Sequence, residues 1–331
     1  MRLFPFAALV ALIATTGCSP LTYQPRVVQV QQLPSHPLPA SSTYVVVVPP
    51  ASVGAAQLTD GITIPGLTKA STPDTAEVTI NASVGQATVT DLTVATSTRE
   101  AIISSSSGPT EYQVYSYTGN ISIPSQLTIT SKKYGQIMSY TQPTTNTLTF
   151  DRDPGTKERF RDTVSLEAAF RSQRPAVLEK ASLSEVESVQ RMANRMLIDN
   201  FTASTQPFRV QLATESSTDP RFAQAATAFD QAVVGNTTDA AAYATRLKPA
   251  MDLWQQIIAS PVGDSDDKKN EATGAALYNQ AIGSFLLDHV DDAERSLLAA
   301  KGLGVDSIRV RYLTDRIADR RKRQTAQGAT P

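Results

Sequence analysis

Three absences limit what this chain of 331 residues can do. The formal net charge is −1 and charges of both signs are spread along the chain, which argues against nucleic acid, whose affinity comes from clustered Lys and Arg. The exception is the basic cluster over residues 320–323, which is interpreted as solvated charge or as favourable charge at the end of the last helix. No apolar run approaches the ~20 residues that a transmembrane helix needs. A single cysteine, Cys18, leaves no intramolecular disulfide to form. The 41% of hydrophobic residues still predicts a packed core rather than disorder.

The N-terminus has the layout of a secretory signal. Arg2 precedes a short apolar run that ends in Ala14-Thr15-Thr16-Gly17-Cys18. A cysteine directly after glycine at the cleavage point resembles the lipobox of bacterial lipoproteins, although Thr15 stands where that pattern usually has leucine. The resemblance implies that residues 1–17 are a signal peptide and that Cys18 carries the lipid. The alternative is an ordinary signal peptide with a free thiol left behind.

The residues after Cys18 predict location and an extended linker. Ser19 follows the cysteine, which by resemblance to lipoprotein sorting favours the outer membrane, with the chain facing the periplasm. Residues 18–42 contain prolines among Gln, Ser and Leu, a composition that blocks helix and favours an extended chain. We therefore expect residues 18–42 to form a Pro-rich tether between the membrane and the folded part.

Residues 43–155 have the pattern of a mostly antiparallel β domain. Val45 to Val48 is a buried-strand pattern, and residues 76–84 and 87–94 alternate apolar and polar side chains. Gly85-Gln86 between them predicts a hairpin, and Gly119-Asn120 predicts a turn between two later strands. Further strands are expected over 111–117, 121–130, 136–141 and 145–150.

Near residues 155–162 the hydrophobic period changes from about two to about 3.6. This change predicts a boundary, followed by an all-α domain over residues 160–323 and a disordered tail over 324–331. Ser182 with Glu185 matches a capping box and predicts the start of a helix. Later helices are expected over 221–234, 240–260, 270–287, 291–300 and 307–321. The fold class is thus α+β, with a β domain followed by helical hairpins.

Part of the helical region resembles tetratricopeptide repeats, which are stacked pairs of antiparallel helices. The residues that carry the resemblance are Tyr278, Asn279, Ala281, Ala293, Leu297 and Ala300, with Ala250, Trp254 and Ile257 upstream. It covers about 60 residues and departs at Ser284, where the repeat has an aromatic. The resemblance implies a protein-binding surface, with Trp254, Tyr278 and Phe285 as candidate binding residues. A generic Ala-packed hairpin is the alternative. For Trp254 the position on the inward-facing stripe favours a core residue, and an exposed binding anchor is the competing interpretation.

The sequence contains no set of residues that points to catalysis or to a cofactor. The two histidines, His36 and His289, cannot form a zinc site with a lipidated Cys18, and no Gly-x-Ser-x-Gly motif accompanies them. Ser265 and Lys268 match only a short pattern. Asp151, Asp153 and Asp162 begin like a calcium loop, but Pro154-Gly155 interrupts it, and a turn with side-chain capping accounts for the same residues.

These observations favour a non-enzymatic cell-envelope lipoprotein that binds a protein partner through its helical half, without metal, cofactor or nucleic acid. A second hypothesis is an assembly or secretion component whose β domain pairs strands with a partner or with copies of itself. A third is an envelope hydrolase with paired carboxylates such as Glu185 and Glu187, but that spacing puts them on different faces of a helix.

Overall fold

The structure is a computed structural model that describes residues 21–101, 110–234 and 240–328. It is a mixed α and β protein divided into two compact units. We call them the helical unit (residues 1–33 and 204–329) and the sheet unit (residues 34–203). The first strand and the last helices therefore share one unit, although some 170 residues of sequence separate them. Among the described residues, no helix is long and apolar enough to cross a membrane.

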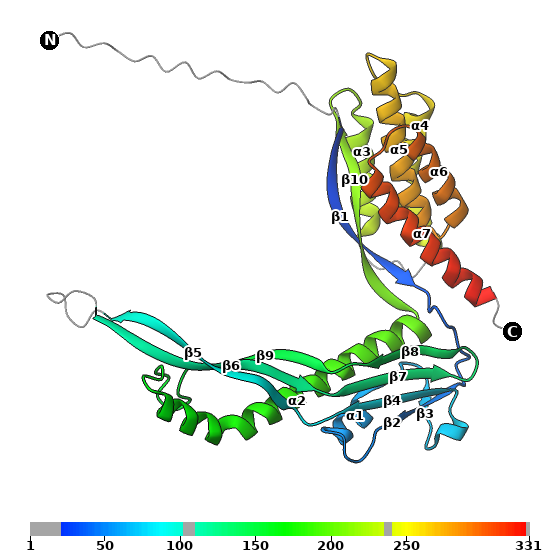
Figure 1. Ribbon diagram of the computed structural model, residues 1–331. Coiled ribbons are helices and arrows are strands. Elements are labelled where there is room, and N and C mark those ends of the chain that lie inside the picture. Colours follow the sequence, from blue (N-terminus) through cyan, green and yellow to red (C-terminus); the bar gives the residue numbers. More distant parts are fainter. Residues whose placement is uncertain (1–20, 102–109, 235–239, 329–331) are drawn as a thin grey trace, which may run out of the picture. The chain divides into compact units, whose positions relative to one another are not determined.

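The helical unit is built on a two-stranded antiparallel ribbon (Figure 1). β1 (Leu21–Gln32) pairs along its whole length with β10 (Ser204–Ser216), so that Val28 lies opposite Phe208. Alternate residues of the ribbon, such as Val28, Phe208 and Val210, are buried against the helices, whereas Val27 on the other face is 57% exposed. This alternation is the reason that the ribbon adheres to the helices by one face.

The helices of this unit form consecutive antiparallel pairs with a final helix against the last pair. They are α3 (Arg221–Val233), α4 (Ala240–Ala259), α5 (Asp266–Leu286), α6 (Val290–Gly302) and α7 (Ser307–Gly328). The Ser265 side chain accepts from the Lys268 backbone N–H and caps α5. Inside the unit, the buried Asn279 amide binds both backbone groups of Ala213, at 3.0 and 2.8 Å, and so ties α5 to β10.

The sheet unit contains two sheets. The larger has the order β3-β2-β4-β7-β8, and the smaller has the order β5-β6-β9. Pairing is antiparallel except where β2 pairs with β3 and β4. The strands of the larger sheet are β2 (Thr43–Val47), β3 (Thr68–Lys69), β4 (Val78–Val84), β7 (Ser125–Ser131) and β8 (Gly135–Thr141). Those of the smaller are β5 (Thr88–Ala101), β6 (Thr110–Ile123) and β9 (Thr144–Phe150). Short helical turns lie at α1 (Ala55–Gly61) and η1 (Pro73–Thr75).

A single long helix, α2 (Thr163–Phe201), runs along these sheets (Figure 1). The Asp162 side chain accepts from the Ser165 backbone N–H at 2.7 Å and caps its first turn. Leu166 and Phe170 near its start, and Val186 to Phe201 near its end, recur at helical spacing and are buried in the same core as the strands. The sheet unit therefore owes its core to α2 as much as to its strands.

The predicted strands and the later helices are largely confirmed, but residues 160–323 are not all-α, because they contain the strand β10. The predicted pairing of the early strands is also wrong. β4 and β5 do not form a hairpin: β4 pairs with β2 and β7, and β5 pairs with β6. Gly119-Asn120 is not a turn, because β6 runs through it to Ile123. β5 bulges opposite this point, and a Cβ on Gly119 would meet the Thr90 carbonyl at 3.0 Å, so glycine is needed for close approach.

The predicted capping box at Ser182 is also wrong, because α2 is continuous there. The Ser182 hydroxyl accepts from the Ala87 backbone N–H at 2.9 Å. Glu185 accepts from the Thr144 hydroxyl at 2.7 Å. Both side chains thus accept hydrogen bonds, as they would at a helix start. Their donors are the Ala87 N–H and the Thr144 hydroxyl of the sheet region, and not N–H groups of a first helical turn.

The predicted domain limits need correction. The expected boundary near residues 155–162 is wrong, since α2 packs on the strands and the units change after Leu33 and after Ala203. Of the expected tether over residues 18–42, Leu21–Gln32 is the strand β1, and residues 33–42 connect it to β2. β1 accommodates Pro25 because it is an edge strand. The expected tail over residues 324–331 is helical as far as Gly328.

Candidate binding cleft

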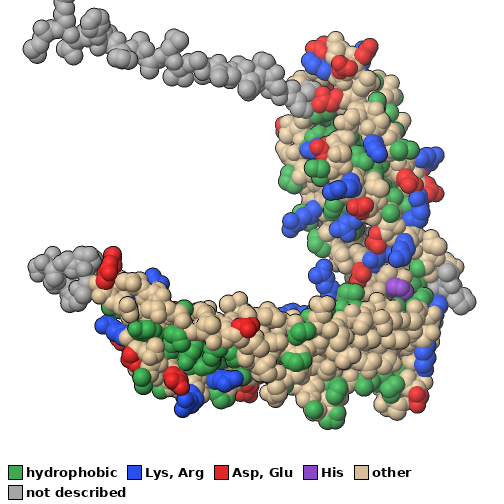
Figure 2. Space-filling view, in the orientation of Figure 1, with side chains coloured by type: hydrophobic (Ala, Val, Ile, Leu, Met, Phe, Trp, Pro, Cys, Tyr) green, Lys and Arg blue, Asp and Glu red, His purple; other side chains and the backbone are tan. Residues whose placement is uncertain are grey.

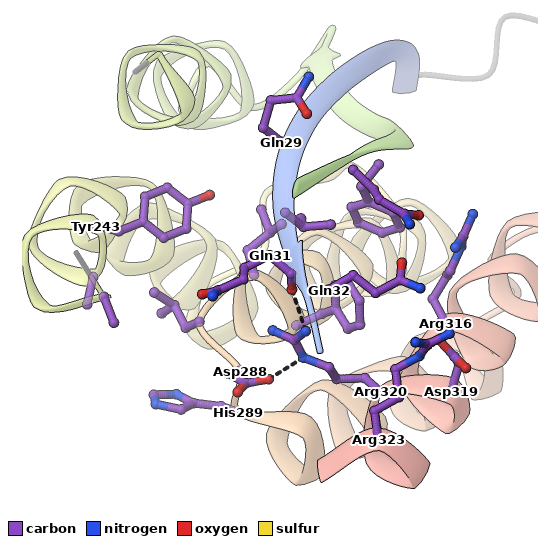
Figure 3. A pocket seen from close by; sticks show the side chains of 18 of the residues that line it. Gln29, Gln31, Gln32, Tyr243, Asp288, His289, Arg316, Asp319, Arg320 and Arg323 are labelled. Atoms are coloured by element: carbon purple, nitrogen blue, oxygen red, sulfur yellow. Dashed lines mark hydrogen bonds and ion pairs between the residues drawn. The ribbon is translucent and has the colours of Figure 1, made fainter. Parts of the chain in front are cut away.

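A cleft of about 390 Å³ lies within the helical unit, where the end of β1 meets α7 (Figure 3). Its walls come from β1, β10, the first turn of α4, the α5–α6 connection and α7. Clefts that bind small molecules or peptide side chains start at ~300 Å³, so this volume suits a short segment rather than a large ligand. The site therefore combines residues from both ends of the chain.

Residues of α7 at helical spacing put cationic side chains along one wall. Arg316, Arg320 and Arg323 recur every three or four residues, and they share one face of the helix. Arg320 pairs with Asp288 and donates to the Gln31 carbonyl, contacts drawn in Figure 3. Arg323, which is buried, pairs with Asp319 at 2.8 Å and donates to the Leu33 carbonyl. These bonds fix the end of β1 against α7.

Arg316 differs from its two neighbours on the helix. Its guanidinium lies 5.4 Å from the Tyr312 ring centroid, and no carboxylate of the described residues is paired with it. The two acidic side chains of the cleft, Asp288 and Asp319, are occupied by Arg320 and Arg323. The cleft thus retains one cation that no carboxylate within it balances.

The opposite wall carries a buried phenol. Tyr243 on α4 is 4% exposed, and its hydroxyl has no hydrogen-bond partner among the described residues. Figure 3 shows this hydroxyl directed toward the space beside Gln31. Burial raises the pKa of Tyr243 to about 12, with a smaller opposing effect of Arg246, so the phenol stays protonated at neutral pH. It is a donor without an acceptor.

The predicted binding residues are only partly brought together. Phe285 lines the cleft together with Phe208, and the rings lie 5.0 Å apart. Trp254 is fully buried against Phe229, which favours the core interpretation over the binding one. Tyr278 is also buried, 6.4 Å from the Tyr23 ring. Neither Trp254 nor Tyr278 lines the cleft. Cys18, the predicted lipid site, lies outside the described residues.

Sequence reasoning missed Tyr243 and the α7 arginines as members of one site. Tyr243 did carry a signal, because it begins the buried stripe of α4 that continues through Leu247, Ala250 and Trp254. A tyrosine in such a stripe needs a partner for its hydroxyl. No signal in the sequence linked this stripe to Gln29–Gln32, since that pairing depends on β1 lying in the helical unit.

The other candidate chemistry resolves into structural contacts. Asp151 pairs with Arg159 at 2.7 Å, whereas Asp153 and Asp162 accept backbone N–H groups of their own turns. These backbone hydrogen bonds hold the pKa values of Asp153 and Asp162 below their usual range. The Lys268 ammonium pairs with Asp264 at 2.8 Å, and the Ser265 hydroxyl accepts from the Lys268 backbone N–H. The described residues contain no group of three or more His, Cys, Asp or Glu placed to hold a metal ion.

The carboxylates considered for a hydrolase are likewise held apart. Glu185 bonds Thr144, while Glu187 faces Arg191 on the exposed side of α2 at 3.6 Å. With this geometry in hand, comparison of the chain with family models, curated proteins and solved structures found no match. The site is therefore interpreted from its own chemistry.

Proposed function

We propose that this chain is a non-enzymatic cell-envelope lipoprotein that binds a protein partner through the cleft of its helical unit. The lipid on Cys18 would hold it at the outer membrane, facing the periplasm. The observation that carries the proposal is the buried Tyr243 hydroxyl, which lines the cleft without a partner. A buried donor without an acceptor costs about 1–3 kcal/mol, a cost that a ligand supplying the acceptor would remove.

The architecture of the helical unit supports the same proposal. Paired helices that follow one another, such as α3 with α4 and α5 with α6, are the arrangement expected of tetratricopeptide-like repeats. Ala281, Ala293 and Ala300 are fully buried in this unit. Small residues at these positions let helices approach closely, as the resemblance requires. We include this repeat-like character in the proposal.

A second candidate rests on β5. Among the described residues this strand pairs only with β6, so its other edge is unpaired. Most of its side chains are exposed on both faces, including Leu92 and Val94. Figure 2 shows that much of the visible face of the sheet unit over β7 and β8 carries few charges. Between Asp91 and Arg99, residues 92–98 of β5 carry no charged side chain. An uncovered, uncharged stretch of edge strand is suited to strand pairing, which supports an assembly role for the sheet unit.

Crosslinking in intact envelopes with an amine-reactive reagent tests both candidates, because each unit has exposed lysines. Links from Lys248 or Lys322 to another protein would support binding by the helical unit. Links between copies through Lys157 or Lys180 alone would support assembly by the sheet unit instead. Cys18→Ala should abolish membrane association and links to membrane-bound partners, and a protein that stays membrane-bound would contradict the lipid anchor.

A further inference from the structure

We propose that the cleft recognises a peptide segment in which a carboxylate lies next to an apolar side chain. This inference rests on the proposed function and names the chemistry of the partner. It follows from three features of the cleft: an unpaired cation, a buried donor, and an apolar wall.

The cation selects the charge of the ligand. Arg320 and Arg323 are neutralised by Asp288 and Asp319, and Arg316 is the one arginine of this wall without a carboxylate among the described residues. A guanidinium binds a carboxylate through two parallel N–H···O bonds. A phosphate monoester carries about −1.5 to −2 charges, so a single arginine would leave part of that charge unbalanced. A single carboxylate is the better match.

The phenol selects an oxygen acceptor. Tyr243 is protonated at neutral pH and its hydroxyl is buried, so it can donate to a carbonyl or carboxylate oxygen that enters the cleft. The carboxamide side chain of Gln31 also lines the cleft, as does that of Gln206, whose Nε2 donates to the Ser204 hydroxyl and whose oxygen can accept. Side-chain amides of this kind hydrogen-bond readily to peptide groups. These donors and acceptors favour a peptide over an aliphatic ligand.

The remaining wall is apolar. Phe208, Phe285, Val30 and Leu287 line the cleft beside the polar groups. An apolar side chain of the ligand gains about 25 cal/mol for each Å² that it buries there. An acidic residue alone would leave this surface uncovered, so the segment must carry both kinds of side chain.

Panning a random heptapeptide phage library on the purified full-length chain tests this inference. We expect enrichment of peptides with Asp or Glu beside an aliphatic or aromatic residue. An enriched peptide, synthesised with a fluorescent label, should bind Tyr243→Phe about three- to ten-fold more weakly, the value of one hydrogen bond. Arg316→Gln should weaken binding at least as much.

Two controls separate recognition from folding. Arg311→Gln removes one charge from an exposed arginine of α7 that does not line the cleft, and it should leave affinity within two-fold of the unaltered chain. Tyr243→Phe should keep or raise the melting temperature, because it removes a buried donor that had no partner. Weaker binding with unimpaired stability is therefore the expected signature.

Several results would overturn the inference. One is enrichment of basic or uncharged peptides. A second is binding of the enriched peptide by Tyr243→Phe and Arg316→Gln with the same affinity as by the unaltered chain. A third is Arg316-dependent binding of phosphatidylglycerol vesicles that displace the peptide. The last would identify an anionic lipid as the occupant. If envelope crosslinking still places a protein on the helical unit, the proposed function stands and only its partner chemistry fails. If crosslinking also finds none, both fail.

Discussion

Trp254 and Tyr243 lie on the same buried stripe of α4, and both have a polar atom without a partner among the described residues. They differ in surroundings. The Trp254 indole packs against Phe229, and its edge lies close to Gly283, so a Cβ there would be 3.1 Å from the ring. Tyr243 lines a cleft. The same helix face therefore belongs to the core at one end and lines the cleft at the other.

Trp254→Ala should lower the free energy of unfolding of the helical unit by about 3–5 kcal/mol, because the large ring is fully buried and its loss leaves a cavity. Urea denaturation followed by circular dichroism measures the change. Leu298→Ala is the matched control: it truncates a side chain on α6 that is 68% exposed, and should cost about 0.5 kcal/mol or less. Equal stability of both variants would contradict the core role of Trp254.

We expect Asp162 to make the stability of α2 depend on pH. The Ser165 backbone N–H, followed by the Ser165 hydroxyl, holds the pKa of Asp162 below its usual range. A lowered folded-state pKa adds stability above the unfolded value of ~3.9, and this stability is lost as pH falls through the folded pKa. Asp162→Ala should therefore lower the Tm at neutral pH, and the difference from the unaltered chain should shrink in acid.

Asp162→Asn separates the charge from the cap. Asparagine keeps a side-chain oxygen for the Ser165 N–H but does not titrate, so its Tm should vary less with pH than that of the unaltered chain. If thermal unfolding of the chain and of Asp162→Ala shows the same Tm difference at pH 3 and pH 7, the cap makes no pH-dependent contribution.

Among the elements, β1 is the one whose role could not be read from its own residues. Prolines and glutamines predicted a tether, and the alternation that buries Leu21 and Val28 and partly buries Val30 is short and interrupted. Its partner β10 had a clearer pattern, with Phe208, Val210 and Leu212 at every second position. Long-range strand pairing depends on the partner and not on local propensity, so composition alone could not predict the ribbon.

Helices were predicted more reliably than strand partners for a related reason. The period of α3 to α7 is a local property, and the predicted ranges agree with the structure to within a few residues at most ends. The Ser182 and Glu185 pattern failed because the same side chains can satisfy the N–H groups of a helix start or polar groups of strands. The pattern correctly indicated two side chains that accept hydrogen bonds, but it did not determine which groups donate to them.

The register of β1 on β10 can be tested by crosslinking. Val27 lies opposite Arg209, where Cα atoms of paired strands are ~4.5–5.5 Å apart. With Cys18 replaced by alanine, Val27→Cys combined with Arg209→Cys should be linked efficiently by a short thiol reagent. Val27→Cys with Thr205→Cys, four residues out of register, should not. Efficient linkage of the second pair, or failure of both pairs to be linked, would contradict the pairing of β1 with β10.

At the scale of the whole molecule, the change of hydrophobic period near residue 155 marks a change of element and not of domain. α2 supplies core residues to the sheet unit, and β1 supplies a strand and one cleft wall to the helical unit. The chain therefore enters the sheet unit after Leu33 and leaves it after Ala203. The unit that contains the cleft is therefore built from two separate stretches of the sequence.

Fragments test this division. Residues 34–203 should fold alone and unfold cooperatively, because their core is complete. Residues 160–331 should aggregate or remain molten, since α2 would expose Val186, Val189 and Leu197 and β10 would lack β1. Solubility and thermal unfolding of the two fragments measure the outcome. A stable, cooperatively melting 160–331 fragment would restore the boundary that the sequence pattern predicted.

Recognition of a partner at the cleft is the central claim, and site-specific photocrosslinking in living cells tests it most directly. A photoreactive amino acid at Gln29, an exposed residue of the cleft, should give a discrete protein adduct that Arg316→Gln reduces. The same group at Leu298, exposed elsewhere on the helical unit, should give none. Adducts of equal yield at both positions, or an adduct only from Thr96 on β5, would contradict the account.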